Sequence, residues 1–169
     1  MSIKRVMKSK QFWLSVGLLL AMVPLIIIGC GSSGEYDSPP ASLSSGVLIE
    51  PSTLKTWIDA GYVNSSGFNK VVIIEAGFSN ASYNTSHIKG ALYVDRWDIV
   101  ETRLEGLAFA PQLVCSGSKM DALIRKLGID DNTTIVFTMG DGTNVLAATR
   151  AYFTFRYWGF PKGKLKFAG

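Results

Sequence analysis

Apolar residues fall along this chain in short blocks, which polar residues, glycines and prolines separate. Residues 71–75 are a β-branched run that ends in a glutamate, which is typical of a parallel strand buried on both faces. Residues 47–49, 91–95 and 134–138 are similarly apolar and are also predicted as strands. Residues 164–168 predict a last short strand, in which lysines alternate with apolar side chains.

Three longer blocks repeat apolar residues at helical spacing and lie between the predicted strands. They are residues 50–60, 118–127 and 145–158. Ser118 and Asp121 have the spacing of a capping box at the start of the second helix. Strands that alternate with helices indicate an α/β domain with a parallel sheet and right-handed crossover connections.

The first residues of the chain predict an export signal that ends at a lipidated cysteine. Four basic residues within residues 1–10 precede an uncharged run over residues 12–28. Gly29-Cys30 then resembles the end of a bacterial lipoprotein signal, which is cleaved before the cysteine. Residues 1–29 would be the signal peptide, and Cys30 would carry the lipid, including palmitate. The alternative is an uncleaved transmembrane anchor, because the apolar run is nearly long enough to span a bilayer.

Composition changes at Cys30 and again near Val47. Residues 30–46 are rich in glycine, serine and proline, and therefore predict a flexible tether. Residues 47–169 form the predicted domain. Localisation is then expected at a bacterial cell envelope, with the membrane lipid bound through Cys30. Gly31 is not the aspartate that often marks inner-membrane retention, which favours an outer membrane.

The formal net charge of +4 belongs to the signal rather than to the domain. Removing the four basic residues of the signal leaves 13 basic and 13 acidic residues. Nucleic acid is excluded as a partner, because no basic stripe with interleaved aromatic residues remains. Lys162, Lys164 and Lys166 alternate as on the solvent side of a strand.

Cysteine and histidine are too few for several kinds of site. The chain has two cysteines and one histidine, and lipidation of Cys30 leaves Cys115 as the single thiol. An intrachain disulfide and a tetrahedral zinc site are therefore both excluded. No cofactor and no metal are expected.

The segment from Tyr83 to Ala91 carries a family resemblance. Its sequence, Tyr-Asn-Thr-Ser-His-Ile-Lys-Gly-Ala, resembles the Tyr…Gly-His-Ile-Pro-Gly-Ala signature of the rhodanese sulfurtransferases, with Ser86 and Lys89 as departures. The order of the later motifs is also similar to that family, over nearly all of residues 47–169. The resemblance implies an open parallel sheet with helices on both faces. The strand that ends at Gly169 would leave this domain without its C-terminal closing elements.

The resemblance also places the reactive group. Rhodaneses need a thiolate at the start of the loop that follows the predicted strand at residues 134–138; it takes sulfane sulfur from thiosulfate as a persulfide. Here the matching positions are Thr138 and Met139, so the nucleophile is missing. The chain is therefore similar to the non-catalytic N-terminal half of a tandem rhodanese. The degenerate loop comprises Thr138, Met139, Gly140, Asp141, Gly142, Thr143 and Asn144.

Other interpretations of the loop remain open. Gly140 and Gly142 match part of a dinucleotide fingerprint, but Val145 stands where a third glycine belongs. A phosphatase loop needs a cysteine, which is absent. The loop is otherwise a tight turn that caps the next helix, or an anion contact made by its backbone N–H groups.

Individual residues outside the loop could also carry chemistry. Cys115 precedes a predicted helix, whose dipole would favour its thiolate, although a structural role in a loop is favoured. Glu75 and Asp95 end neighbouring strands and could pair as carboxylates. Structural hydrogen bonds to loop N–H groups or to Arg150 are favoured instead. The residues assigned a structural signature role are Glu75, His87, Gly90, Asp95 and Arg150.

Two functions follow from the sequence. The first is the non-catalytic half of a membrane-tethered, exported sulfurtransferase, whose catalytic rhodanese domain acts in cis or in trans. The second is a rhodanese-like lipoprotein that serves as a binding or structural module without enzymatic activity.

Overall fold

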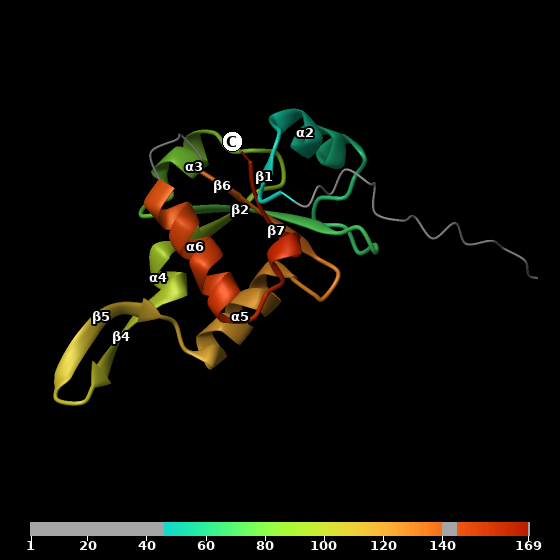
Figure 1. Ribbon diagram of the computed structural model, residues 1–169. Helices are drawn as coiled ribbons and strands as arrows, with labels where there is room; N and C mark the ends of the chain where they lie inside the picture. The colour runs from blue at the N-terminus through green and yellow to red at the C-terminus, as the bar shows by residue number, and fades with distance from the viewer. Residues whose placement is uncertain (1–45, 140–144, 169) are drawn as a thin grey trace, which may run out of the picture. The chain divides into compact units, whose positions relative to one another are not determined.

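A parallel sheet forms the centre of the domain. The computed structural model describes residues 46–139 and 145–168 (Figure 1). All neighbouring strands of the sheet are parallel, which confirms the predicted α/β class. In spatial order the strands are β1 (Leu48–Ile49), β7 (Leu165–Ala168), β6 (Thr134–Thr138), β2 (Val71–Gly77) and β3 (Leu92–Asp95).

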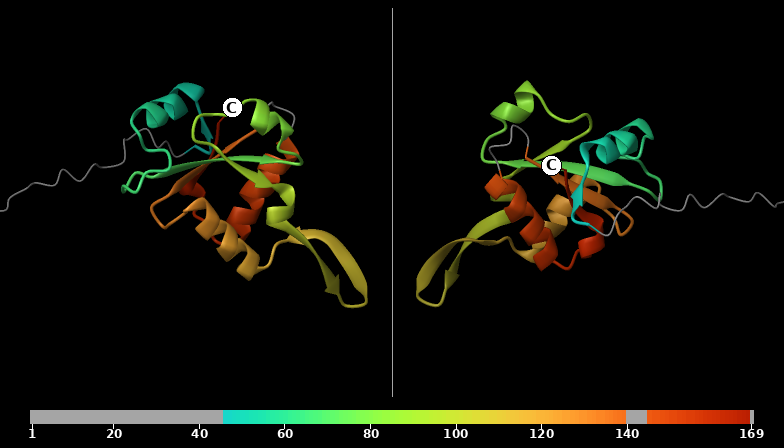
Figure 2. Two further views of the ribbon diagram at one scale, coloured as in Figure 1. Left: turned by 180° about the vertical axis from the view of Figure 1, so that it is seen from behind. Right: turned by 45° about the horizontal axis from the view of Figure 1, so that its top comes forward.

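Helices cover both faces of the sheet, as Figure 2 shows from two further directions. The side chains of β2 alternate between the two layers: Val72, Ile74 and Ala76 belong to one apolar cluster, and Val71 and Ile73 to the other. This period of two follows from the pleat of the strand. The first layer holds α4 (Arg96–Ile99), α5 (Gly117–Leu127) and α6 (Val145–Tyr157); the second holds α2 (Pro51–Asp59) and α3 (Ala81–Thr85).

The start of α5 differs from the predicted capping box. The N-cap residue is Ser116 rather than Ser118, so Ser118 and Asp121 do not form the box. The backbone N–H of Ser116 donates to Glu101 Oε2 at 2.9 Å. A carboxylate distant in sequence therefore fixes the start of this helix. At the other end, Gly128 has a φ of 64° and ends the helix as predicted.

A two-stranded antiparallel hairpin projects from the domain (Figure 1), and the sequence analysis did not predict it. It consists of β4 (Val100–Glu105) and β5 (Ala108–Val114). Most of its side chains are exposed or half-buried on both faces, so the apolar alternation that identifies a half-buried strand is weak. The remaining regular element is a 3₁₀ turn at Lys162–Lys164.

Lys166 corrects the interpretation of the C-terminal lysines as a solvent face. It lies on β7, between β1 and β6, and is 1% exposed. Its Nζ donates to the carbonyl oxygen of Gly46 at 2.7 Å, and burial lowers the pKa of its ammonium group. Lys162 and Lys164 lie outside the strand, in the 3₁₀ turn. Because β7 is an interior strand covered on both faces, it has no solvent side.

The described ranges contain no helix that is both long and apolar enough to cross a membrane. The predicted signal peptide, the tether and Cys30 lie outside these ranges, and so does the loop at residues 140–144.

Candidate functional site

The carboxyl ends of three strands meet at one edge of the sheet. Glu75 of β2 is in register with Tyr93 of β3 on one side and with Thr138 of β6 on the other. Helix α6 begins at Val145, after the loop that follows β6. In open α/β sheets this edge is where ligands bind. The structure thus brings Glu75, Tyr93 and Thr138 together, beside the place where the resemblance locates an active loop.

No thiol is present where β6 ends. Thr138 is buried, and its hydroxyl donates to the carbonyl oxygen of Ile74 at 3.4 Å. Met139 follows and is half-buried. Neither side chain can form a persulfide. The rest of the predicted degenerate loop, residues 140–144, lies outside the described part of the chain.

Cys115 lies at the end of β5, immediately before α5, and is fully buried in the apolar layer beneath α5 and α6. Burial raises the pKa of its thiol, and this effect exceeds the opposing attraction of Lys119. The shift is opposite to the one expected from a helix N-terminus alone. Cys115 therefore has the environment of a structural cysteine rather than of a nucleophile.

Glu75 and Asp95 differ in their surroundings. Asp95 ends β3 and is in register with Gly77, whereas Glu75 lies before the end of β2 rather than at it, opposite Tyr93. Glu75 is 2% exposed. Asp95 caps α4, and its Oδ1 accepts from the backbone N–H of Trp97 at 2.8 Å. The pKa of the Tyr93 phenol is raised, first by burial and then by the negative charge of Asp95. Asp95 therefore has a local structural function at the start of α4.

The segment from Tyr83 to Ala91, which carries the family resemblance, is held by hydrogen bonds in the second layer. The Tyr83 hydroxyl donates to the carbonyl oxygen of Ala91 at 2.8 Å, and Asn64 Nδ2 donates to that of Gly90 at 2.9 Å. The ring of His87 stacks on Tyr83 with centroids 4.1 Å apart, and its Nδ1 lies 2.8 Å from the Tyr83 carbonyl oxygen. His87 and Gly90 thus contribute to local structure at this position.

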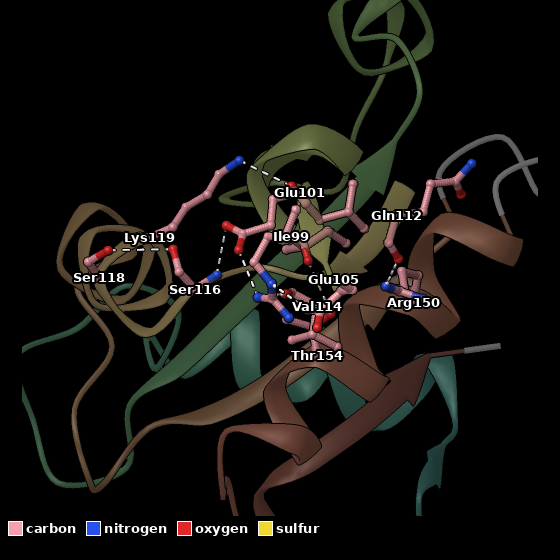
Figure 3. A network of polar contacts seen from close by, with 12 residues as sticks. Ile99, Glu101, Glu105, Gln112, Val114, Ser116, Ser118, Lys119, Arg150 and Thr154 are labelled. Carbon is pink, nitrogen blue, oxygen red and sulfur yellow. Dashed lines mark hydrogen bonds and ion pairs between the residues drawn. The ribbon is translucent and has the colours of Figure 1, made fainter. Parts of the chain in front are cut away.

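Arg150 reaches the hairpin rather than the two carboxylates. Its Nη2 donates to the carbonyl oxygen of Gln112 on β5, as Figure 3 shows. In residues 46–139 and 145–168, none of the ion pairs involves Arg150. The expected bond between Arg150 and Glu75 or Asp95 is therefore replaced by a contact with β5. Sequence reasoning missed Gln112, because the hairpin itself was not predicted.

A polar network holds the base of the hairpin against the helices (Figure 3). Glu101 Oε1 accepts from Arg103 Nη1 at 2.7 Å, while the same guanidinium nitrogen donates to the Val114 carbonyl oxygen at 3.0 Å. The Ser116 N–H and then Arg103 lower the pKa of Glu101. The Thr154 hydroxyl of α6 donates to the Ile99 carbonyl oxygen at 3.4 Å. These contacts hold the base of the hairpin at the start of α5 and join α4 to the last turns of α6.

Metal binding finds no support in the described residues. Within them, no three histidine, cysteine, aspartate or glutamate side chains lie together as a metal-binding group.

Comparisons with known proteins identify the fold. No family model matches the chain, and no curated protein matches it. The solved structures that are similar include SseA from Escherichia coli, a 3-mercaptopyruvate sulfurtransferase with the rhodanese fold, and YnjE. Identity is 16% to SseA, with a TM-score of 0.53, and 25% to YnjE, with a TM-score of 0.55.

Both similarities cover 72% of this chain, which spans 39% of the SseA chain and 27% of the YnjE chain. They agree with the parallel central sheet and its surrounding helices. The domain therefore has a rhodanese-like fold.

Proposed function

We propose that this chain is the non-catalytic rhodanese-like part of a lipid-anchored, exported sulfurtransferase. The observation that carries the proposal is the end of β6, which brings Thr138 and Met139 to the carboxyl edge of the sheet. Sulfane-sulfur transfer needs a thiolate there, to take the outer sulfur of thiosulfate and release sulfite. A catalytic rhodanese domain, in cis or in trans, would supply that thiolate.

The environment of Cys115 supports this assignment. A nucleophilic cysteine is accessible and has a lowered pKa. Cys115 is fully buried, and its pKa is raised. Because the sequence contains only one other cysteine, the proposed lipidation site Cys30, this chain has no suitable sulfur carrier of its own.

Sulfur transfer by the isolated chain should be absent. The full-length chain in detergent would be incubated with thiosulfate, and then assayed for thiocyanate formation from cyanide and for sulfur added to its intact mass. We expect neither signal above a protein-free sample, and the same result for Cys115→Ser. Thiocyanate formation that disappears in Cys115→Ser would contradict the non-catalytic assignment.

The anchor is a separate part of the proposal, and it rests on Cys30 and the apolar run before it. We place the protein in a bacterial cell envelope, favouring an outer membrane. The intact mass of the protein extracted from its native membrane should correspond to cleavage before Cys30 and a lipid-modified cysteine. Cys30→Ser should leave the precursor uncleaved and without lipid. Release of an unmodified, soluble form of the parent would contradict the anchor.

The same mass measurement separates two forms of the proposal. A mass well above that of residues 30–169 with their lipid would indicate a catalytic domain in cis. A mass equal to that of the lipidated chain would require a catalytic partner in trans.

The second candidate function is a binding module without sulfur chemistry. It is favoured by a pocket that carries two arginines and opens between the hairpin and α6.

A further inference from the structure

A pocket of about 610 Å³ lies against the first turns of α6. This volume is within the usual range of small-molecule sites. Its walls come from four places in the sequence: the residue after β2, helix α4 with the start of β4, strand β5 and helix α6. The side chains that matter below are Phe78, Arg96, Leu146, Thr149, Arg150 and Phe153.

The charged residues that the described part of the chain contributes to the pocket lining are both positive. They are Arg96 and Arg150, and none of the described lining residues is a carboxylate. Across the described ranges, no ion pair neutralises either guanidinium group. Arg150 makes a hydrogen bond to the Gln112 carbonyl oxygen, which is a neutral acceptor, so this contact does not compensate the positive charge.

Aromatic rings hold both guanidinium groups in place. The Arg96 guanidinium carbon lies 4.8 Å from the centroid of the Phe78 ring and 4.5 Å from that of Trp97. That of Arg150 lies 5.7 Å from the centroid of Phe153. Stacking on a ring orients a guanidinium group and leaves its N–H edge available to an oxyanion.

The rest of the lining is suited to an apolar ligand body. Phe78 and Phe153 are about half exposed, and Leu146 is 75% exposed. The Thr149 hydroxyl is already bonded to backbone carbonyl oxygens of its own helix. The pocket thus combines two oriented cations with exposed aromatic and aliphatic surface.

We propose that this pocket binds a small organic anion. Arg96 and Arg150 would bind its carboxylate or sulfonate group, and Phe78, Leu146 and Phe153 would contact its apolar body. Guanidinium groups form the strongest hydrogen bonds when the acceptor is charged, which explains the preference for an anion over a neutral ligand. The inference is independent of sulfur transfer, because it depends on binding alone.

Binding would be measured by calorimetry on the full-length chain in a non-ionic detergent. The probes are benzenesulfonate, benzoate, inorganic sulfate and the neutral compound benzyl alcohol. We expect both aromatic anions to bind, and inorganic sulfate and benzyl alcohol to bind at least tenfold more weakly. Equal binding of benzyl alcohol would overturn the role of charge, and equal binding of sulfate would overturn the role of the apolar wall.

Charge-removing variants test the two arginines. Arg96→Gln and Arg150→Gln should each weaken benzenesulfonate binding about tenfold, which corresponds to about 1.4 kcal/mol. Arg125→Gln is the matched control, because Arg125 is exposed on α5 and does not line the pocket. An equal loss of affinity in Arg125→Gln would show that net charge, rather than this pocket, governs binding.

A second pair of variants tests the pocket without removing the hydrogen bond that Arg150 makes with the hairpin. Leu146→Glu places a carboxylate at the pocket wall, and Leu146→Gln places a neutral side chain of similar size there. Because Leu146 is 75% exposed, both variants are expected to fold. Benzenesulfonate should bind more weakly to Leu146→Glu than to Leu146→Gln by about tenfold. Equal affinities in folded variants would overturn the proposed site.

Discussion

A Gly90→Ala variant should have a free energy of unfolding about 3 kcal/mol below that of the parent chain. Gly90 has a φ of 81°, in the region that residues with a Cβ atom rarely adopt. A Cβ atom built there would lie 2.8 Å from Cγ1 of Val63, which is closer than real Cβ contacts. The variant therefore combines backbone strain with a steric clash. Urea unfolding, followed by tryptophan fluorescence, measures the loss.

Gly61→Ala is the matched control for this prediction. Gly61 has a similar φ of 75°, but a Cβ atom there would have no neighbour within 4 Å. It should lose about 1 kcal/mol, from backbone strain alone. Adding Val63→Ala to Gly90→Ala should remove the clash, so the double variant should lose less than the two single losses combined. Equal losses in Gly90→Ala and Gly61→Ala would show that the contact with Val63 is unimportant.

Replacing Lys166 by methionine should increase the free energy of unfolding by about 1 kcal/mol at pH 7. The side chain is 1% exposed on an interior strand, and burial lowers the pKa of its ammonium group. A methionine of similar length keeps the apolar contacts and removes the desolvated charge. The hydrogen bond to Gly46 is one of the polar contacts that are lost, and because Gly46 is exposed, water can replace its donor.

The advantage of Lys166→Met should decrease as the pH rises. The folded-state pKa of Lys166 lies below 10.5, its ordinary value. Between these two values the unfolded chain binds more protons than the folded one, so the parent gains stability with increasing pH. The difference between parent and variant should therefore be largest below the folded pKa and decline towards pH 10.5. Lys162→Met, at an exposed position, should show no such difference from the parent. If the difference in free energy of unfolding between Lys166→Met and the parent did not change with pH, the explanation would be contradicted.

The buried strands were predictable because nearly every residue in them is apolar, which by itself indicates burial on both faces. All seven residues of β2 are buried, and its β-branched run already indicated a strand covered on both faces. The hairpin has no comparable apolar pattern, because its side chains mostly face solvent on both sides. Lys166 was misinterpreted for a related reason: alternation shows that a strand has two faces, but not whether one faces water.

The candidate site was predictable in position but not in its contacts. Thr138 and Met139 follow a predicted strand, so their place at the edge of the sheet follows from the pattern. The contact of Arg150 with Gln112 joins residues 38 apart and depends on the unpredicted hairpin. For Cys115, position before a helix suggested a lowered thiol pKa, whereas the surrounding apolar layer raises it. Burial of that kind is a property of the packed domain, not of neighbouring residues.

The sheet pairs its first strand with its last, since Leu48 is in register with Phe167. Nearly the whole domain must therefore be synthesised before β1 finds its partner, and contacts of such sequence separation form slowly. A nascent chain of this topology stays incompletely folded during most of its synthesis. If the chain is exported as proposed, the same delay would keep the polypeptide extended enough to be threaded across a membrane, and the sheet would close after the transfer.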